Sequence, residues 1–345
     1  MWMPQVLGGI VGMIGAMLLT KLLLPVFRYL KIVDVPFTSG RKIHARPMVL
    51  VGGVAIAVSF SLVIWAATFI APTYVPQLPA MQWQALIFAS LVLFFVGIID
   101  DRFGLPPAVQ LVGPLVATAI VVLAGIQIHS VTRPLGGIIL FSAGSGVTIF
   151  LTSVWLLAMM YGTKLLDGLD GLTTGLSGIG AVMIFALTQT AQFFEPRLGF
   201  ASLVFAGCCA GFLFFNFYPA RAFLGEGGSL FLGFVLAVLS ILSGSKIATA
   251  LLVMGLAVFD VIRLILVRMS HGKTPFAADQ RHLHHLLLRS GVSHRKAVLL
   301  YYVCGIACGL LALFLPTVGK ILLLIALLAG EWMLAAYLEK RLTKK

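Results

Sequence analysis

Acidic residues are scarce in this chain: only 11 of its 345 residues are Asp or Glu, against 24 Lys and Arg. Charged residues of both signs make up 10% of the sequence, hydrophobic residues make up 60%, and the mean hydropathy is +1.08. Such a composition lies far outside the range of water-soluble domains. The sequence therefore predicts an all-α, polytopic integral membrane protein.

Cysteine is also rare. The four cysteines fall inside apolar runs, with neither metal-binding partners nor an external loop to cross-link, so we interpret them as small packing residues. They are Cys208, Cys209, Cys304 and Cys308. The first apolar run, residues 6–27, lacks a preceding basic region and a following cleavage site, which favours a retained span over a signal peptide. Because no polar region is left for a soluble domain, we predict one transmembrane domain over residues 1–345.

Long apolar runs dominate the sequence. A helix needs roughly 20 apolar residues to cross the hydrocarbon core of a bilayer, and about ten or eleven runs approach that length. The candidate spans are 6–27, 48–71, 83–99, 106–125, 145–165, 171–190, 199–216, 229–243, 246–268, 297–315 and 319–338.

The basic residues are distributed unevenly around these spans. Alternate gaps and the C-terminal tail hold 17 Lys and Arg, whereas the opposite gaps hold four. The positive-inside rule then places the N-terminus outside and the tail in the cytoplasm. His129 falls on the outer side, in a glycine-containing stretch with Arg133 that predicts a small hairpin. The basic residues that give the net charge of +13 flank the spans. This position favours lipid headgroups and phosphorylated substrates as their partners over nucleic acid.

Most of the acidic residues lie in the gaps assigned to the cytoplasm. A carboxylate beside hydrocarbon is costly unless it is paired, hydrated or bound to a cation, so it marks a functional site. Asp100 and Asp101 close one span, and their mutual repulsion favours a metal or a raised pKa on one of them. A helix end meeting water is the simpler interpretation of one such pair, but other gaps repeat the pattern. Their acidic residues are Asp34, Asp167, Asp170, Glu226 and Asp279.

Two glycine-rich gaps are informative. Asp167 and Asp170 are three residues apart and would share a face at helical spacing, and Gly168 would let a ligand approach the backbone. Glu226 lies in a glycine-rich turn before a predicted helix start, where backbone N–H groups can bind phosphate. Either gap alone fits an ordinary turn with a capping residue.

The longest basic gap contains a histidine cluster beside an arginine: Arg281, His282, His284 and His285. Three histidines invite a zinc interpretation, but the cluster lacks the carboxylate or thiolate ligands of an obvious zinc site, and nearby arginines would repel a metal. Hydrogen-bond donors to a diphosphate are a better interpretation of this cluster than zinc ligands. A solvated basic face is the alternative.

These segments, in this order, resemble the polyprenyl-phosphate N-acetylhexosamine-1-phosphate transferases. The resemblance runs from Asp34 to about Gly291 and includes the sequence DVPFTSGRKIHARP followed by Gly52 and Gly53. It implies an enzyme that needs Mg²⁺, or Mn²⁺, and transfers a sugar 1-phosphate from a UDP-sugar to undecaprenyl or another polyprenyl phosphate. UMP would be released, and the reaction would begin the membrane stage of cell-envelope glycan synthesis. The family also implies a homodimer.

The resemblance assigns roles to residues. Catalytic roles fall to Asp100, Asp101 and Asp167, and metal binding falls to Glu226 and Asp167. Substrate binding falls to Lys42, His44, Gly168, Leu169, Asp170, Asn216, Phe223, Arg281, His282, His284 and His285. The His-x-His-His form is similar to the branch that uses UDP-N-acetylglucosamine, with the UDP-MurNAc-pentapeptide branch of peptidoglycan synthesis as the alternative.

The chain also departs from the family pattern. Tyr161 and Lys164 replace asparagines, Glu226 replaces an aspartate, and Gln110 and Pro114 replace a basic residue and a glutamine. These departures leave the donor sugar open and make an inactive scaffold one alternative. A lipid or solute transporter is another, although neither repeat symmetry nor carboxylates at mid-membrane depth appear. Direct displacement and a two-step route through a carboxylate both remain open.

Overall fold

Long apolar helices make up most of the protein. The computed structural model describes residues 2–34, 47–134, 136–244, 247–270, 272 and 281–343. Seven of the described helices are long and apolar enough to cross a membrane. They are α1 (Met3–Tyr29), α2 (Gly52–Ile70), α3 (Ala80–Phe103), α6 (Gly146–Leu166), α8 (Pro196–Asn216), α13 (His294–Phe314) and α14 (Thr317–Thr343).

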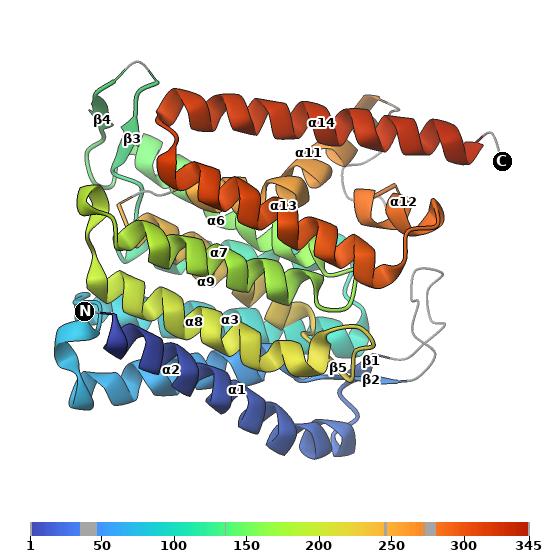
Figure 1. Cartoon of the computed structure of the whole chain (residues 1–345). Coiled ribbons are helices and arrows are strands. Elements are labelled where there is room, and N and C mark those ends of the chain that lie inside the picture. The colour runs from blue at the N-terminus through green and yellow to red at the C-terminus, as the bar shows by residue number, and fades with distance from the viewer. Residues whose placement is uncertain are drawn as a thin grey trace.

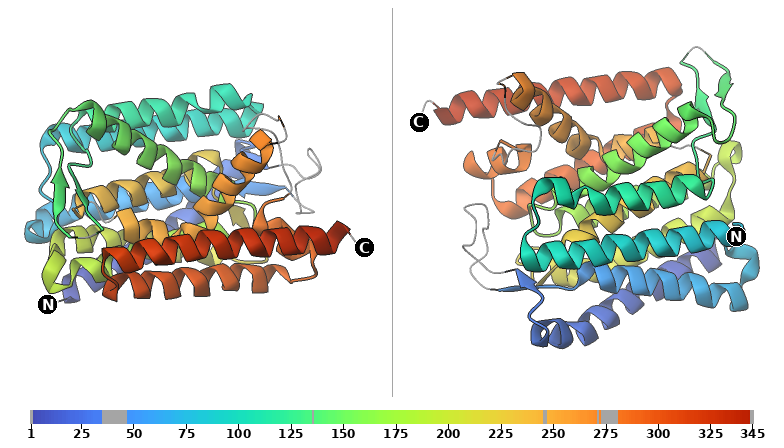
Figure 2. Two further views of the ribbon diagram at one scale, coloured as in Figure 1. Left: turned by 90° about the horizontal axis from the view of Figure 1, so that it is seen from above. Right: turned by 180° about the vertical axis from the view of Figure 1, so that it is seen from behind.

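The remaining predicted spans are shorter or broken helices. They are α4 (Pro107–Gln110) with α5 (Val112–Leu123), α7 (Leu172–Thr188), α9 (Glu226–Leu242), and α10 (Ile247–Val253) with α11 (Gly255–Ser270). The α10–α11 pair is bent by 78°, and Figure 2 shows α11 slanting across its neighbours. Each predicted span thus corresponds to one apolar segment, and the all-α membrane fold is confirmed.

The two ends of the bundle differ. The N-terminus and the β3–β4 hairpin lie at one end, whereas β1, β2, β5 and α12 (Leu283–Arg289) lie at the other (Figure 1). The predicted hairpin is confirmed: β3 (Ser130–Thr132) pairs antiparallel with β4 (Ile138–Leu140). The separation of the hairpin from the histidine segment agrees with their assignment to opposite sides of a membrane.

A three-stranded sheet at the α12 end was not predicted. Strand β2 (Met48–Leu50) pairs antiparallel with β1 (Val33–Asp34) and parallel with β5 (Ala222–Phe223). The span predicted near residues 48–71 begins at Gly52, because the backbone of Met48–Leu50 pairs with β5. This sheet joins the first loop to the loop that carries Glu226.

Glycine contacts hold the start of α9 between two other helices. A Cβ atom added at Gly53 of α2 would lie 2.2 Å from Cα of Gly228, and one added at Gly97 of α3 would lie 2.3 Å from Cα of Gly227. Because any side chain here would clash with backbone, these glycines allow α9 to approach both helices closely. The packing fixes the position of Glu226.

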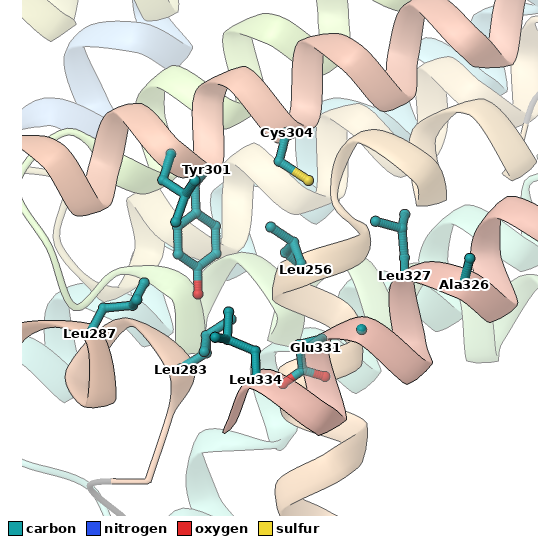
Figure 3. Close-up of a pocket in the computed structure, with 11 residues that line it drawn as sticks. Leu256, Leu283, Leu287, Tyr301, Cys304, Ala326, Leu327, Glu331 and Leu334 are labelled. Carbon is teal, nitrogen blue, oxygen red and sulfur yellow. The ribbon is translucent and has the colours of Figure 1, made fainter. Parts of the chain in front are cut away.

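A cavity of about 220 Å³ lies beside α11, α13 and α14. Its lining is apolar apart from Tyr301 and Glu331, which approach it from α13 and α14 (Figure 3). The cysteines have no disulfide partners, and Cys208, Cys209 and Cys308 are buried. Their predicted role as packing residues agrees with this burial.

Candidate active site

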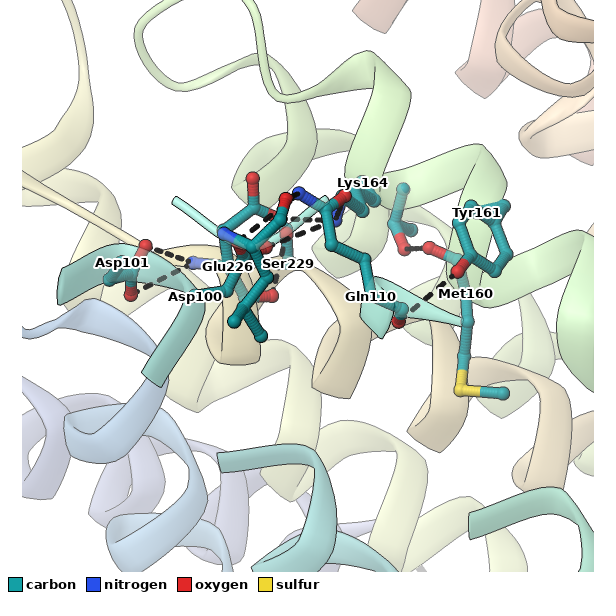
Figure 4. A network of polar contacts seen from close by, with 10 residues as sticks. Asp100, Asp101, Gln110, Met160, Tyr161, Lys164, Glu226 and Ser229 are labelled. Atoms are coloured by element: carbon teal, nitrogen blue, oxygen red, sulfur yellow. Dashed lines mark hydrogen bonds and ion pairs between the residues drawn. The ribbon is translucent and has the colours of Figure 1, made fainter. Parts of the chain in front are cut away.

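Four acidic residues from three helix ends meet near the small sheet. Asp100 and Asp101 lie in the last turn of α3, Asp167 directly follows α6, and Glu226 is the first residue of α9. Figure 4 shows how side chains from α3, α4, α6 and α9 form one polar network. The acidic residues of these three gaps therefore lie close together, whereas Asp279 lies outside the described residues.

Asp101 holds the beginning of α9. Both of its carboxylate oxygens accept the backbone N–H of Glu226, at 3.1 and 3.2 Å. Gly225 precedes the helix and has no side chain to cap it. Since the first N–H groups of a helix lack intrahelical partners and carry partial positive charge, a carboxylate from α3 satisfies both needs. Asp101 therefore positions Glu226.

Asp100 faces a different set of partners. Its Oδ1 atom accepts from the backbone N–H of Leu105 at 2.8 Å and from Nε2 of Gln110 at 3.1 Å. Its Oδ2 atom lies 3.6 Å from Nζ of Lys164. The two adjacent carboxylates thus diverge, and separate donors relieve the repulsion expected between them.

The Lys164 ammonium lies at the centre of this network. Its Nζ atom is 2.9 Å from Oε2 of Glu226 and 2.9 Å from Oε1 of Gln110. From the sequence, Lys164, Gln110 and Tyr161 stand out only as departures from the family pattern and were not predicted as site residues. A lysine inside a predicted span was the available signal, because such a charge needs a partner.

The turn between α6 and α7 carries Asp167 and Asp170. The expectation that they share a helical face is wrong, because α6 ends at Leu166 and the backbone turns before α7. Desolvation by the surrounding protein and the negative charge of Glu226 raise the pKa of Asp167. Asp170 accepts the backbone N–H of Ala220 at 2.9 Å, which ties this turn to the α8–α9 loop.

The histidine segment packs directly on the same turn. A Cβ atom added at Gly168 would lie 2.5 Å from Nε2 of His284, so this glycine makes room for His284 in the structure. Burial lowers the pKa of His284 to about 3, with smaller contributions from His285 and His282. The neutral imidazole can still donate a hydrogen bond, which is the role expected for the histidine segment.

His282 belongs to a second buried cluster. Its Nδ1 atom lies 2.8 Å from Oδ2 of Asp260 in α11. Asp260 also binds Arg263 at 2.9 Å, and Arg263 binds Glu331 at 3.0 Å and Glu339 at 3.3 Å, both in α14. Arg263 further donates to the backbone carbonyl of Arg281. This cluster anchors the histidine segment to α11 and α14.

The other predicted substrate-binding residues are placed as follows. Asn216 is buried, accepts from Thr174 at 2.7 Å and donates to the Ala222 carbonyl at 3.1 Å. Leu169 is buried in the core, and Phe223 is partly buried in β5. Lys42 and His44 lie outside the described residues.

The carboxylates suit a hard cation by their chemistry. Mg²⁺ prefers oxygen ligands and commonly combines one or two carboxylates with substrate phosphates. Asp167 and Glu226 are close enough for the charge of Glu226 to act on Asp167. Among the described residues, no three His, Cys, Asp or Glu side chains are grouped to hold a metal ion by themselves. This donor set fits a cation that is completed by phosphate oxygens.

Comparison with known proteins gives a consistent result. Residues 83–244 match the family described as glycosyl transferase family 4. The chain is 32% identical over 302 residues to the decaprenyl-phosphate N-acetylglucosaminephosphotransferase of Mycobacterium leprae, covering 78% of this chain and 73% of that protein.

Two further relatives cover more of the chain at lower identity. The probable undecaprenyl-phosphate N-acetylglucosaminyl 1-phosphate transferase of Bacillus subtilis is 29% identical over 89% of this chain and 85% of its own length. The undecaprenyl-phosphate alpha-N-acetylglucosaminyl 1-phosphate transferase of Yersinia pestis is 28% identical over 86% of this chain and 78% of its own length.

Proposed function

Because this chain belongs to the polyprenyl-phosphate N-acetylhexosamine-1-phosphate transferase family, we propose that it transfers N-acetylglucosamine 1-phosphate from UDP-N-acetylglucosamine to undecaprenyl phosphate or a related polyprenyl phosphate. The observation that carries this function is the meeting of Asp100, Asp167 and Glu226 with the His284 segment at one end of the bundle, in a chain 32% identical to a transferase of this kind.

The reaction joins two anions. In the direct route, an oxygen of the polyprenyl phosphate attacks the β-phosphorus of the UDP-sugar and forms a new P–O bond, while the bond from that phosphorus to the UMP oxygen breaks and UMP leaves; a two-step route through a carboxylate is the alternative. Positive groups must offset this charge and hold the phosphates in line. Lys164 and the backbone N–H groups at the start of α9 are positive groups of this chain that lie beside the carboxylates.

We also propose Mg²⁺ as the cofactor, bound by Glu226 and Asp167 together with diphosphate oxygens. Bound there, it would supply positive charge to the phosphates during transfer. Asp101 keeps Glu226 in place by capping α9, and Gly168 holds the Asp167 turn against His284. Mn²⁺ is expected to substitute, because both ions favour oxygen ligands.

The proposed setting is the cytoplasmic side of a bacterial inner membrane, with the N-terminus outside. The basic asymmetry of the sequence and the location of the soluble nucleotide-sugar pool support it. A homodimer is proposed from the family resemblance.

The decisive experiment uses the purified full chain with UDP-N-acetylglucosamine, undecaprenyl phosphate and Mg²⁺. We expect UMP and a lipid-linked sugar diphosphate in equal amounts, strongly reduced product with Asp100→Asn, and reversible loss of activity in excess EDTA. UDP-MurNAc-pentapeptide in place of the first donor tests the peptidoglycan branch. Absence of UMP with every UDP-sugar would overturn the proposed function in favour of a transporter or scaffold, and full activity in EDTA would remove the metal.

A further inference from the structure

The Lys164 ammonium is surrounded by oxygen atoms from three other elements. Glu226 of α9 and Gln110 of α4 each place an oxygen 2.9 Å from Nζ, and Asp100 of α3 places one at 3.6 Å. Of these oxygens, those of Glu226 and Gln110 lie within hydrogen-bond distance of the ammonium, and that of Asp100 adds a longer ion-pair contact. Figure 4 shows the side chains of Gln110, Glu226 and Asp100 gathered around Lys164.

Gln110 is oriented to receive this charge. Its Nε2 atom donates to Oδ1 of Asp100 at 3.1 Å and to the carbonyl of Leu105 at 2.8 Å. With both amide hydrogens used, Oε1 is directed at Lys164. The orientation of the amide is therefore fixed by its partners, and the network is built around a cation.

Lys164 lies deeper than its partner Glu226. The side chain of Lys164 is 12% exposed, whereas that of Glu226 is 35% exposed. A divalent cation that arrives from solvent therefore meets a carboxylate whose Oε2 atom is already paired with an ammonium. Two positive charges at such short range repel each other strongly wherever water is partly excluded.

We propose that Lys164 is the resident cation of this site: its ammonium pairs with Glu226, lies close to Asp100, and competes with the divalent metal for Glu226, so that it sets the metal affinity. The inference builds on the proposed function, because the metal belongs to that reaction. Lys164 is here a positioning residue that acts through Glu226. It keeps the carboxylates paired in the absence of substrate.

The test measures Mn²⁺ binding to the purified full chain by electron paramagnetic resonance, without either substrate. Lys164→Gln should tighten Mn²⁺ binding by about tenfold or more, because one repelling charge is removed. Lys164→Asn should do the same, so the test does not depend on one variant folding. Lys164→Arg keeps the charge and should bind Mn²⁺ as the wild type does.

Two controls isolate the effect. Lys21→Gln removes the same charge from an exposed position in α1 and should leave Mn²⁺ binding unchanged. Adding Glu226→Gln to Lys164→Gln should abolish the gain, because the contested ligand is gone. Thermal unfolding should show the metal-free Lys164→Gln protein destabilised and its stability restored by Mn²⁺, which loss of packing alone would not produce.

Unchanged Mn²⁺ affinity in both neutral variants would overturn the role of Lys164. A separate assay of UMP release decides the proposed function. If the wild type releases no UMP but Lys164→Gln binds Mn²⁺ more tightly, the proposed function fails and the lysine inference stands. If the wild type releases UMP but the neutral Lys164 variants bind Mn²⁺ with unchanged affinity, the proposed function stands and the lysine inference fails.

Discussion

Asp101 accepts the backbone N–H of Glu226 through both of its carboxylate oxygens, at 3.1 and 3.2 Å. Its neighbour Asp100 instead accepts from Leu105 and Gln110. Two consecutive aspartates therefore perform different tasks. Asp101 fixes the start of α9, and Asp100 remains beside Lys164 at the centre of the polar network.

Amide replacements should separate these tasks. Asp100→Asn and Asp101→Asn should each lower UMP release strongly, with ~10²- to 10⁴-fold loss expected at Asp100 if it takes part in proton transfer. Asp101→Ala should also reduce the free energy of unfolding by about 0.5–2 kcal/mol, the usual cost of a lost helix cap. Kinetics and thermal unfolding measure the two effects. Wild-type turnover in both Asn variants would leave the pair as an ordinary helix end.

Glu226 offers a test of side-chain length. Glu226→Gln should abolish UMP release, because it removes the charge that pairs with Lys164 and the proposed metal ligand. Glu226→Asp should retain a measurable part of the activity, since it keeps a carboxylate at the start of α9. UMP release at several Mg²⁺ concentrations distinguishes them. Wild-type kinetics in Glu226→Gln would exclude this residue as a ligand.

Gly168 should tolerate no side chain. Gly168→Ala would place a Cβ atom 2.5 Å from Nε2 of His284 and should displace the histidine segment, with loss of most activity. Gly330→Ala, in α14, meets no atom within 4 Å and is the matched control. UMP release should be unchanged in the control. Equal activity of both variants would show that the contact between Gly168 and His284 is not needed.

Arg263 is predicted to be essential for stability. Arg263→Gln would leave the carboxylates of Asp260 and Glu331 buried without their shared cation. Breaking a buried ion pair from one side costs about 3–5 kcal/mol. Thermal unfolding in detergent should show this loss, and Arg289→Gln, which removes an exposed charge from the end of α12, should not. If Arg263→Gln melted at the same temperature as the wild type, the pairing of Arg263 with Asp260 and Glu331 would be contradicted.

The membrane orientation is open to cysteine labelling in intact cells. Cysteines placed at Arg102 and Gly272, which are both exposed, should resist a reagent that cannot cross the membrane. A cysteine at Arg133, near the β3–β4 hairpin, should react. Labelling in the reverse pattern would place the active site outside and contradict the predicted topology.

Much of the fold follows from apolar run lengths alone. Each predicted span has a helical counterpart, and the hairpin near Arg133 was found from its turn residues. The sheet was missed, because strands of two or three residues have no detectable alternation and one of them, Met48–Leu50, is apolar enough to read as helix. The bend between α10 and α11 also has no proline to mark it.

The sequence identified the acidic residues of the site better than the basic residues that pair with acidic side chains in the fold. The positions of Asp100, Asp167 and Glu226 were found because carboxylates stand out in an apolar sequence. Their pairing was not, since Lys164 and Arg263 lie within predicted spans and were left out of the count of basic residues in the gaps. A charge inside an apolar run needs an opposite charge or access to water, and that rule draws attention to both residues, as it does to Lys21.

The buried Arg263 cluster has a consequence for biosynthesis. Asp260 precedes Arg263 by three residues and binds it within the same helix, so these two charges leave the ribosome as a pair. Glu331 follows Arg263 by 68 residues. During elongation the nascent chain therefore carries the arginine with a single local counter-charge until α14 emerges. Because helices are made in sequence order, the cluster that anchors the histidine segment is complete only after the last helix has docked.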